Sequence, residues 1–373
     1  MNRIRHPRAS RAASPLCAAL LSCALAAPAL ADHNEGGGVD AKSHAPIGVM
    51  GDHLHAPGEV MFSFRYMRMG MEGSRIGTDP VAPETIATTV PNRFFGAPGQ
   101  PPTLRVVPTD MTMDMYMLGA MVGLTERVTL MVMGQVIEKE MNHLTFAGPA
   151  GPDLLGEFQT KSSGFGDTKI AALVGLFDQT KTGGVWRAHL NLGLSLPTGS
   201  IGERDQILTP TGATPSPRLP YPMQIGSGTV DLEPGITIVG ETDRFAWGAQ
   251  YRATVRLDDN EAGYTHGDAH IGTAWAQWGP TPAWAFSVRA EARAQDAIDG
   301  IDPMIVAPVQ TANPDFQGGT TVMAGPGANY AVQSGPLRGH RLAVEALFPL
   351  VRDLNGPQLE TDWTLTLGWQ KTF

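Results

Sequence analysis

The chain has 373 residues, of which 17% are charged, and its formal net charge is −9. This acidic balance, together with the lack of any cluster of Lys and Arg, argues against a nucleic-acid partner. Both cysteines, Cys17 and Cys23, lie near the start of the chain. The sequence beyond them therefore has no thiol for a disulfide or a thiolate metal site.

Residues 1–31 have the features of a secretory signal peptide. Four arginines precede an apolar run that closes on Ala29-Leu30-Ala31, the small-x-small pattern of a cleavage site. A transmembrane anchor is a weaker interpretation because Pro28 interrupts a run too short to span a bilayer. A lipoprotein site at Cys23 is a second alternative. Removal of residues 1–31 on export would leave 23 basic and 36 acidic residues, a net charge of −13.

Residues 32–57 form a Gly-rich segment that we expect to be flexible, exposed and periplasmic. Its candidate metal ligands are His44, Asp52, His53 and His55. Imidazole together with carboxylate suits Cu(II), Zn or Ni. Histidines are also common in exposed segments without a metal, and the spacing here follows no rigid pattern. The sequence therefore indicates a candidate metal site without establishing one.

From residue 58 onward the chain consists of short alternating segments, which predict strands because successive side chains of a strand point to opposite faces. No segment after the signal peptide reaches the ~18 apolar residues of a membrane-spanning helix. Twelve strands are expected, at 58–71, 110–124, 127–141, 165–177, 184–196, 226–240, 243–257, 264–278, 282–295, 318–330, 339–349 and 358–373. The glycines and Pro326 make the tenth the weakest pattern.

These segments predict an all-β fold in which residues 58–373 form a transmembrane up-and-down antiparallel β-barrel of about twelve strands. Short turns alternate with long loops near 72–109, 142–164, 197–225 and 296–317, as is usual in outer-membrane barrels. Tryptophans near strand ends favour an apolar face against lipid over the packed core of a soluble sandwich, the alternative fold. The terminal Phe373 is the kind of residue that the barrel-insertion machinery recognises. We therefore expect outer-membrane lipid as a partner and the outer membrane of a Gram-negative bacterium as the location.

Methionines gather on one face of three consecutive predicted strands. The aromatic and aliphatic residues opposite them would contact lipid, so the methionines are expected to line the lumen: Met61, Met67, Met69, Met71, Met111, Met113, Met115, Met117, Met121, Met131 and Met133. Neighbouring strands would join them into one patch. Three roles remain open for it: filling the wall, providing a soft surface for apolar or aromatic solutes, and ligating Cu(I) or Ag(I).

Charged residues are also expected on the lumen face, and Arg65, Arg252 and Arg289 are candidates for the solute path. Their alternative role is cross-strand ion pairing that satisfies buried charges. The sequence contains no G-x-S-x-G, H-E-x-x-H or phosphate-binding loop. We therefore expect neither enzyme activity nor a cofactor.

Several stretches resemble the outer-membrane transporter family labelled "MetA pathway of phenol degradation". They are GLSLPTGS (193–200), GSGTVDLEPGIT (226–237) and GHRLAVEALFPLVRDLNGPQLETDWTLTLGW (339–369), and residues 45–69 resemble the start of a branch of that family. The resemblance implies uptake of aromatic solutes and supplies no site residues. We expect a channel or transporter for a small solute, either an aromatic compound or a soft metal. The alternative is a non-conducting surface protein whose external loops bind ligands. The sequence leaves open the substrate, a plug in the lumen and the oligomeric state.

Overall fold

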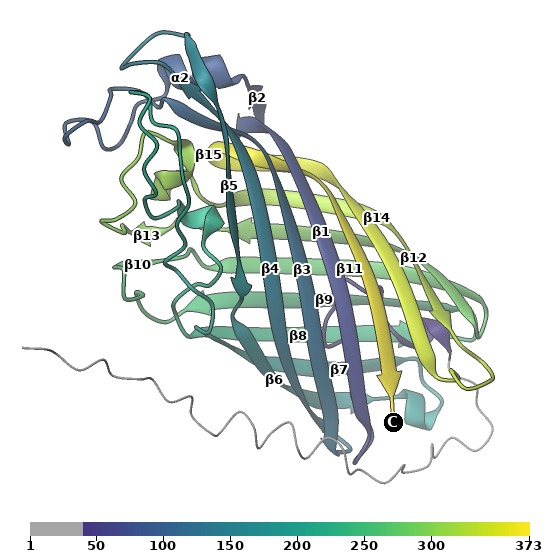
Figure 1. Ribbon diagram of the computed structural model, residues 1–373. Coiled ribbons are helices and arrows are strands. Elements are labelled where there is room, and N and C mark those ends of the chain that lie inside the picture. The colour runs from purple at the N-terminus through teal and green to yellow at the C-terminus, as the bar shows by residue number, and fades with distance from the viewer. Residues whose placement is uncertain (1–39) are drawn as a thin grey trace, which may run out of the picture. The chain divides into compact units, whose positions relative to one another are not determined.

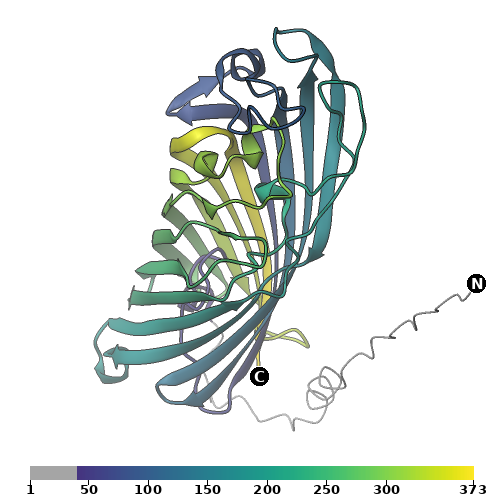
Figure 2. The ribbon, with the colours of Figure 1, turned by 90° about the vertical axis from the view of Figure 1, so that its left-hand side faces the viewer.

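A computed structural model describes residues 40–373, and the predicted signal peptide lies outside the described residues. The unit that spans Gly38–Thr372 is an antiparallel sheet closed on itself (Figures 1 and 2). Its barrel strands are β1 (Val60–Gly77), β3 (Val106–Thr125), β4 (Val128–Phe146), β6 (Thr168–Asp178), β7 (Trp186–Leu196), β8 (Asp231–Glu241), β9 (Phe245–Arg256), β11 (Ala269–Thr281), β12 (Trp284–Gln295), β14 (Gly319–Ala331) and β15 (His340–Thr372). Each pairs with the next around the ring, and β15 closes it on β1.

Strand β15 passes along the barrel twice. Its first part pairs with β14 up to Leu354, and from Leu354 onward it pairs with β1. Its two halves lie side by side, because Arg341 donates a hydrogen bond to Gln370 and Trp369 donates one to His340 over 2.9 Å. The described chain thus runs along the barrel wall twelve times, in agreement with the number of strands expected from the sequence.

Strand β5 (Leu154–Phe165) lies where the sequence predicted only a long loop. It pairs with the outer half of β4 and is followed directly by β6, which pairs with the inner half. Between them Gly166 donates a backbone hydrogen bond to Gln135, so one long strand is interrupted at this point. Many polar side chains obscure the alternation in β5, whose exposed residues include Glu157, Gln159 and Lys161.

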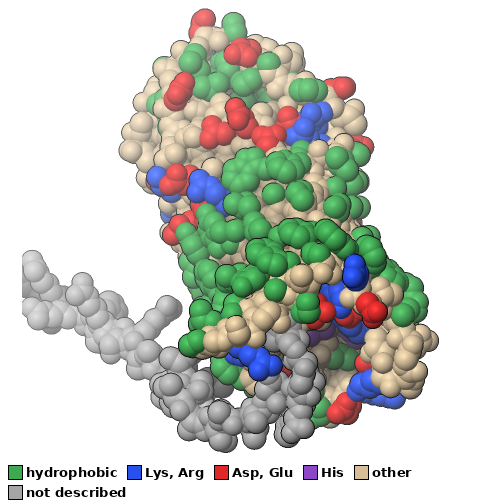
Figure 3. Space-filling model, turned by 90° about the vertical axis from the view of Figure 1, so that its right-hand side faces the viewer, with side chains coloured by type: hydrophobic (Ala, Val, Ile, Leu, Met, Phe, Trp, Pro, Cys, Tyr) green, Lys and Arg blue, Asp and Glu red, His purple; other side chains and the backbone are tan. Residues whose placement is uncertain are grey.

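The outward face of the barrel is apolar. Phe64, Val132, Leu192, Val288 and Leu342 all point outward and are exposed, whereas their inward neighbours along each strand are buried or partly buried. Figure 3 shows hydrophobic side chains as a broad band over one face of the molecule, with charged residues beyond its edges. Among residues 40–373 no helix is long and apolar enough to cross a membrane.

Long loops cover the end of the barrel where β3 begins, which we call the outer end. They include β2 (Asp79–Val81), α2 (Pro83–Thr89), β10 (Tyr264–Thr265), β13 (Asp299–Gly300) and the 3-10 turns η4 (Tyr221–Met223), η5 (Gln310–Ala312) and η6 (Pro314–Phe316). Their buried apolar side chains form clusters of their own, one around Tyr221, Tyr264 and Ile305 and another around Ile86 and Phe146. The loops therefore fold over the outer mouth.

The opposite, inner end has short connections, such as the two residues between β3 and β4. Short connections are typical of the periplasmic end of outer-membrane barrels. Residues 40–57, here called the luminal segment, lie inside the barrel at this end and include the 3-10 turn η2 (Ala41–Ser43). The sequence predicts that residues 32–57 are exposed and flexible. Instead Ile47, Val49, Asp52 and His55 are buried, because the lumen wall supplies hydrogen-bond partners for the segment's backbone.

Candidate functional site: the barrel lumen

The inward methionines of β1, β3 and β4 form one continuous surface, here called the methionine wall. Strand register places Met67 opposite Met115, and Met69 opposite Met113. Five of the predicted lumen methionines are buried: Met61, Met111, Met117, Met121 and Met133. Another six are partly exposed: Met67, Met69, Met71, Met113, Met115 and Met131. The alternation along the three strands therefore places all of these methionines on the face that the sequence predicted.

Both ends of the methionine wall pack against chain segments that enter the lumen. Near the outer end, Met111 and Met141 pack with Leu219 and Met223 from the loop that contains η4. Near the inner end, Met61 packs with other wall residues and with Leu54 of the luminal segment. A flexible thioether side chain fills such irregular spaces well. The end methionines thus pack against these segments, whereas those in the middle of the wall stay partly exposed.

Charged residues line the side of the barrel opposite the methionine wall, and most are paired. Arg289 on β12 lies 2.7 Å from Glu345 on β15 and 2.6 Å from Glu291. Lys169 pairs with Glu233, and the guanidinium of Arg256 pairs with Asp231. Cross-strand ion pairing, the alternative role for Arg289, is therefore present, with Glu345 on β15 as the partner.

The other two arginines predicted for the solute path have different surroundings. Arg65 is buried on β1, and its Nε donates a 3.1 Å hydrogen bond to the carbonyl oxygen of Ile47 in the luminal segment. Arg252 is partly exposed on the inner face of β9, where its charge acts on Lys169 and Arg293. Arg65 thus holds the luminal segment, whereas Arg252 contributes to a cationic part of the lumen.

An apolar cavity of about 590 Å³ lies among the loops at the outer end, and we call it the external cavity. It is lined by Val106, His143, Phe158, Ile207, Leu219 and Val309 together with several prolines. The rings of His143 and Phe158 are stacked with centroids 4.5 Å apart and 5° between their planes. The cavity thus offers a flat aromatic surface within an apolar enclosure. The sequence does not predict this cavity, because segments far apart in the chain supply its walls.

The luminal segment is fastened to the wall by hydrogen bonds around most of the circumference. Four wall side chains form hydrogen bonds with backbone carbonyl oxygens of the segment. Gln277 bonds the carbonyl of His44 over 3.0 Å, and Arg341 bonds that of Ala45 over 2.5 Å. Gln250 bonds the carbonyl of Met50 and His189 bonds that of Gly51, each over 2.9 Å. These contacts come from β11, β15, β9 and β7. The inner end of the lumen is therefore occupied by ordered backbone.

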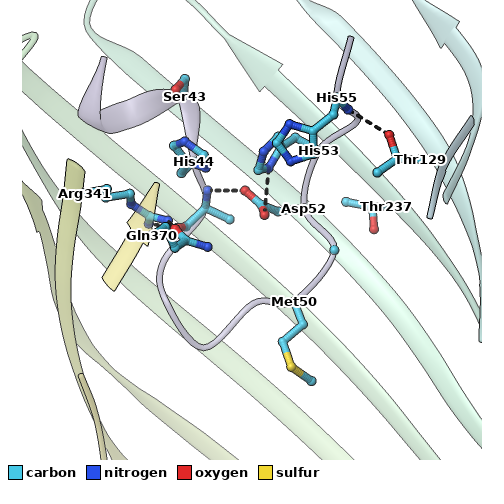
Figure 4. A network of polar contacts seen from close by, with 12 residues as sticks. Ser43, His44, Met50, Asp52, His53, His55, Thr129, Thr237, Arg341 and Gln370 are labelled. Carbon is cyan, nitrogen blue, oxygen red and sulfur yellow. Dashed lines mark hydrogen bonds and ion pairs between the residues drawn. The ribbon is translucent and has the colours of Figure 1, made fainter. Parts of the chain in front are cut away.

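The four predicted metal ligands are brought together within the luminal segment (Figure 4). The ring centroids of His44 and His53 are 4.5 Å apart, and those of His53 and His55 are 4.7 Å apart. Asp52 accepts hydrogen bonds from the Ala45 backbone at 2.8 Å and from His53 Nδ1 at 3.0 Å. One donor atom each from His44, Asp52 and His53 lies within 4.8 Å of the others.

Burial sets the charge of this cluster. It lowers the pKa of His44 well below the usual value, and the neighbouring His53 adds to this effect. Burial also lowers the pKa of His55, although Glu59 acts in the opposite direction. Burial alone would raise the pKa of Asp52, but His53, His44 and Arg341 together hold it well below its usual value. Neutral imidazoles of His44 and His55 beside the Asp52 carboxylate are thus favoured near neutral pH.

Together, the closed antiparallel sheet, the outward apolar belt and the loop-covered outer mouth define an outer-membrane β-barrel. Among solved structures, the chain is similar to the COG4313 outer membrane channel from Pseudomonas putida F1, with a TM-score of 0.56 and 15% identity over 87% of this chain and 99% of that chain. At this identity the likeness concerns the fold alone.

More distant likenesses extend to other outer-membrane proteins. A FadL homologue from Pseudomonas aeruginosa has a TM-score of 0.41 and 12% identity over 84% of this chain and 90% of that chain. A deltaS2 mutant of the monoaromatic hydrocarbon channel TodX has a TM-score of 0.45 and 8% identity over 86% and 91% of the two chains. Neither likeness is close enough to support an argument. No family model and no curated protein match the chain, so the resemblance to the phenol-degradation family is not confirmed.

Proposed function

We propose that the protein is a passive outer-membrane channel for small apolar solutes, including aromatic ones. The observation that carries this proposal is the continuity between the external cavity and the methionine wall. Ile207 and Leu219 line the cavity, and the same two side chains pack with Met111 and Met141 on the inner face of the barrel. A solute that leaves the cavity therefore meets apolar surface along β3 and β4.

The middle of this path suits a solute with both apolar and polar parts. On one side the partly exposed Met67, Met113 and Met115 offer soft, polarizable contacts, which are favourable at the edge of an aromatic ring. On the opposite side Arg252 and the paired charges of β6 to β12 can hydrogen-bond a hydroxyl or carboxylate. A phenolic or aromatic-acid solute could use both sides at once.

Passage to the periplasm requires the luminal segment to yield. Several of its contacts with the wall are single hydrogen bonds from uncharged side chains to backbone carbonyl oxygens, each with a net contribution of about 0.5–1.5 kcal/mol. A local displacement that breaks a few of them is small compared with unfolding of the barrel. We therefore propose that the segment is the inner gate of the channel.

The test is uptake of a labelled phenolic solute by intact cells that produce the protein, with glycerol as a polar solute for comparison. Ile207→Asp places a charge in the external cavity and is expected to lower the initial rate of phenolic uptake several-fold. Gln206→Asp, at an exposed neighbour that does not line the cavity, is the matched control. Equal rates in the two variants, at equal surface abundance, would refute a path through this cavity.

Planar-bilayer recording separates this proposal from the alternative of a non-conducting surface protein. The purified barrel is expected to show small, discrete conductance steps, because the luminal segment restricts the lumen without sealing it covalently. A protein that binds phenolic ligands and never conducts, even after displacement of the segment, would instead be a receptor.

A further inference from the structure

We propose that His44, Asp52 and His53 form a binding site for a divalent transition-metal ion, Zn²⁺, Ni²⁺ or Cu²⁺, which fastens the luminal segment on itself. Figure 4 shows His44 on one arm of the segment and Asp52 with His53 on the other. Between them the chain turns through residues 45–51, the part with most of the wall contacts. An ion bound by both arms would close this turn at its base. This inference does not depend on which solute the channel carries.

The donor set matches these ions in chemistry and nearly in distance. Imidazole nitrogens with a carboxylate oxygen suit Zn²⁺, Ni²⁺ and Cu²⁺. A tetrahedral zinc site with bonds of about 2.0–2.1 Å requires ligand atoms roughly 3.3 Å apart. The donors of His44, Asp52 and His53 already lie within 4.8 Å of one another. Because the two histidines are only partly buried, rotation of their side chains can close this difference.

Hydrogen bonds already orient these side chains. Asp52 is held by the backbone N–H of Ala45, and its other oxygen accepts from Nδ1 of His53. The 3.0 Å between Asp52 Oδ1 and His53 Nδ1 is close to the spacing of two ligand atoms on one zinc ion, so a bound ion would take the place of the shared proton. His55 repeats this arrangement, since its Nδ1 lies 3.0 Å from Glu59.

An independent observation is that two buried ring nitrogens have no hydrogen-bond partner. They are Nδ1 of His44 and Nε2 of His55, and the His55 residue is only 3% exposed. Leaving a buried polar atom unsatisfied costs free energy, so such atoms in a native structure call for an explanation. A bound cation would supply one partner to His44. His55, whose ring centroid lies 4.7 Å from that of His53, is the candidate for a fourth ligand.

The charge of Arg341 opposes cation binding at this site. Its guanidinium bonds the Ala45 carbonyl, close to Asp52, and its charge acts on His44 and Asp52. Asp52 and Glu59 supply the compensating negative charge. Replacement of Arg341 by glutamine should therefore tighten metal binding. The affinity of metal bound by histidines elsewhere on the surface would not change.

The experiment is titration of the full barrel, purified in detergent, with Zn²⁺ and Co²⁺ against a competing chelator. We expect one tight site per chain and the visible absorption of nitrogen-bound Co²⁺. His44→Ala and His53→Ala should each weaken binding about 100-fold or more, since loss of an orienting partner alone costs 10–100-fold. His270→Ala, at an exposed histidine outside the luminal segment, should leave affinity unchanged. Tight binding that survives in the double variant His44→Ala/His53→Ala would overturn the proposal.

Hydrogen exchange tests whether the bound ion holds the two arms of the luminal segment together. In the wild-type protein, Zn²⁺ should slow exchange of the backbone amides of residues 45–52 by at least about tenfold, because opening the segment would require release of the ion. The same ion should leave exchange unchanged in Asp52→Asn, which keeps the side-chain shape and removes the charge. Metal binding without added protection would overturn the proposed clasp between the two arms.

Discussion

Arg289 on β12 and Glu345 on β15 are joined by two hydrogen bonds of 3.0 and 2.7 Å, and Gly48 of the luminal segment lies directly against this pair. Both charged side chains are buried. A Cβ atom on Gly48 would overlap the carboxylate and the guanidinium. The wall and the segment thus fit each other only because residue 48 has no side chain.

Gly48→Val should displace the luminal segment and raise channel conductance several-fold. The segment is expected to move rather than the ion pair, because breaking a buried pair costs about 3–5 kcal/mol. Single-channel recording in planar bilayers provides the measurement. Gly272→Ala is the control, since a Cβ there meets open space. Unchanged conductance in a fully assembled Gly48→Val barrel would show that the segment does not restrict the lumen.

The direction of the side chains can be tested with adjacent residues on β4. Val132 faces outward and is 46% exposed, whereas Met131 faces the lumen. Val132→Arg should strongly impair insertion into lipid vesicles, because a lipid-facing arginine near the midplane costs ~2–4 kcal/mol. Met131→Arg should insert with a smaller loss. Equal yields of folded barrel for both would contradict the assignment of inside and outside.

The middle of the methionine wall should respond to polarity rather than to sulfur. Changing Met67, Met113 and Met115 together to leucine preserves the apolar surface, usually at a cost below ~1.5 kcal/mol per site. Phenolic uptake should then stay near the wild-type rate. The same three positions changed to glutamine should lower it several-fold. If both triple variants match the wild type, these methionines only fill the wall.

Deletion of Phe373 should reduce assembly in the outer membrane, because the insertion machinery would lose its terminal aromatic residue. The measurement is the amount of heat-modifiable, folded barrel in outer-membrane fractions. Phe373→Tyr retains an aromatic ring and should assemble normally. Normal assembly after the deletion would exclude Phe373 as the recognised residue.

Acidification should loosen the loop that contains His266. Burial lowers the pKa of this histidine to about 4, and the charges of Arg256 and Lys139 act in the same direction. Since the unfolded value is about 6.5, the folded loop loses stability as the pH falls below 6.5, by at most about 3 kcal/mol once it is below 4. Hydrogen exchange of residues 257–268 should accelerate over this range in the wild type and much less in His266→Gln. Parallel acceleration in both proteins would assign the effect to other groups.

Much of the barrel could be predicted from residue order, because a strand that separates lipid from a lumen must alternate. Val132 and Met131 are assigned to opposite faces by position alone, and the structure agrees. Pro326 lies within β14, and this strand still pairs with β12 on one side and with β15 on the other. Strand β5 escaped prediction because its outward face meets water instead of lipid, which removes the contrast between faces.

The sequence by itself determined the alternation, the apolar outer face and the methionine face of three neighbouring strands, since each follows from the period of two along a single strand. Only the tertiary structure decided what fills the lumen. Residues 40–57 contain no pattern that distinguishes an exposed tail from a packed one, and their burial depends on Arg65, His189, Gln250 and other wall residues far along the chain. The same applies to the geometry of the histidine cluster, because only the turn of the packed segment brings His44 to Asp52 and His53.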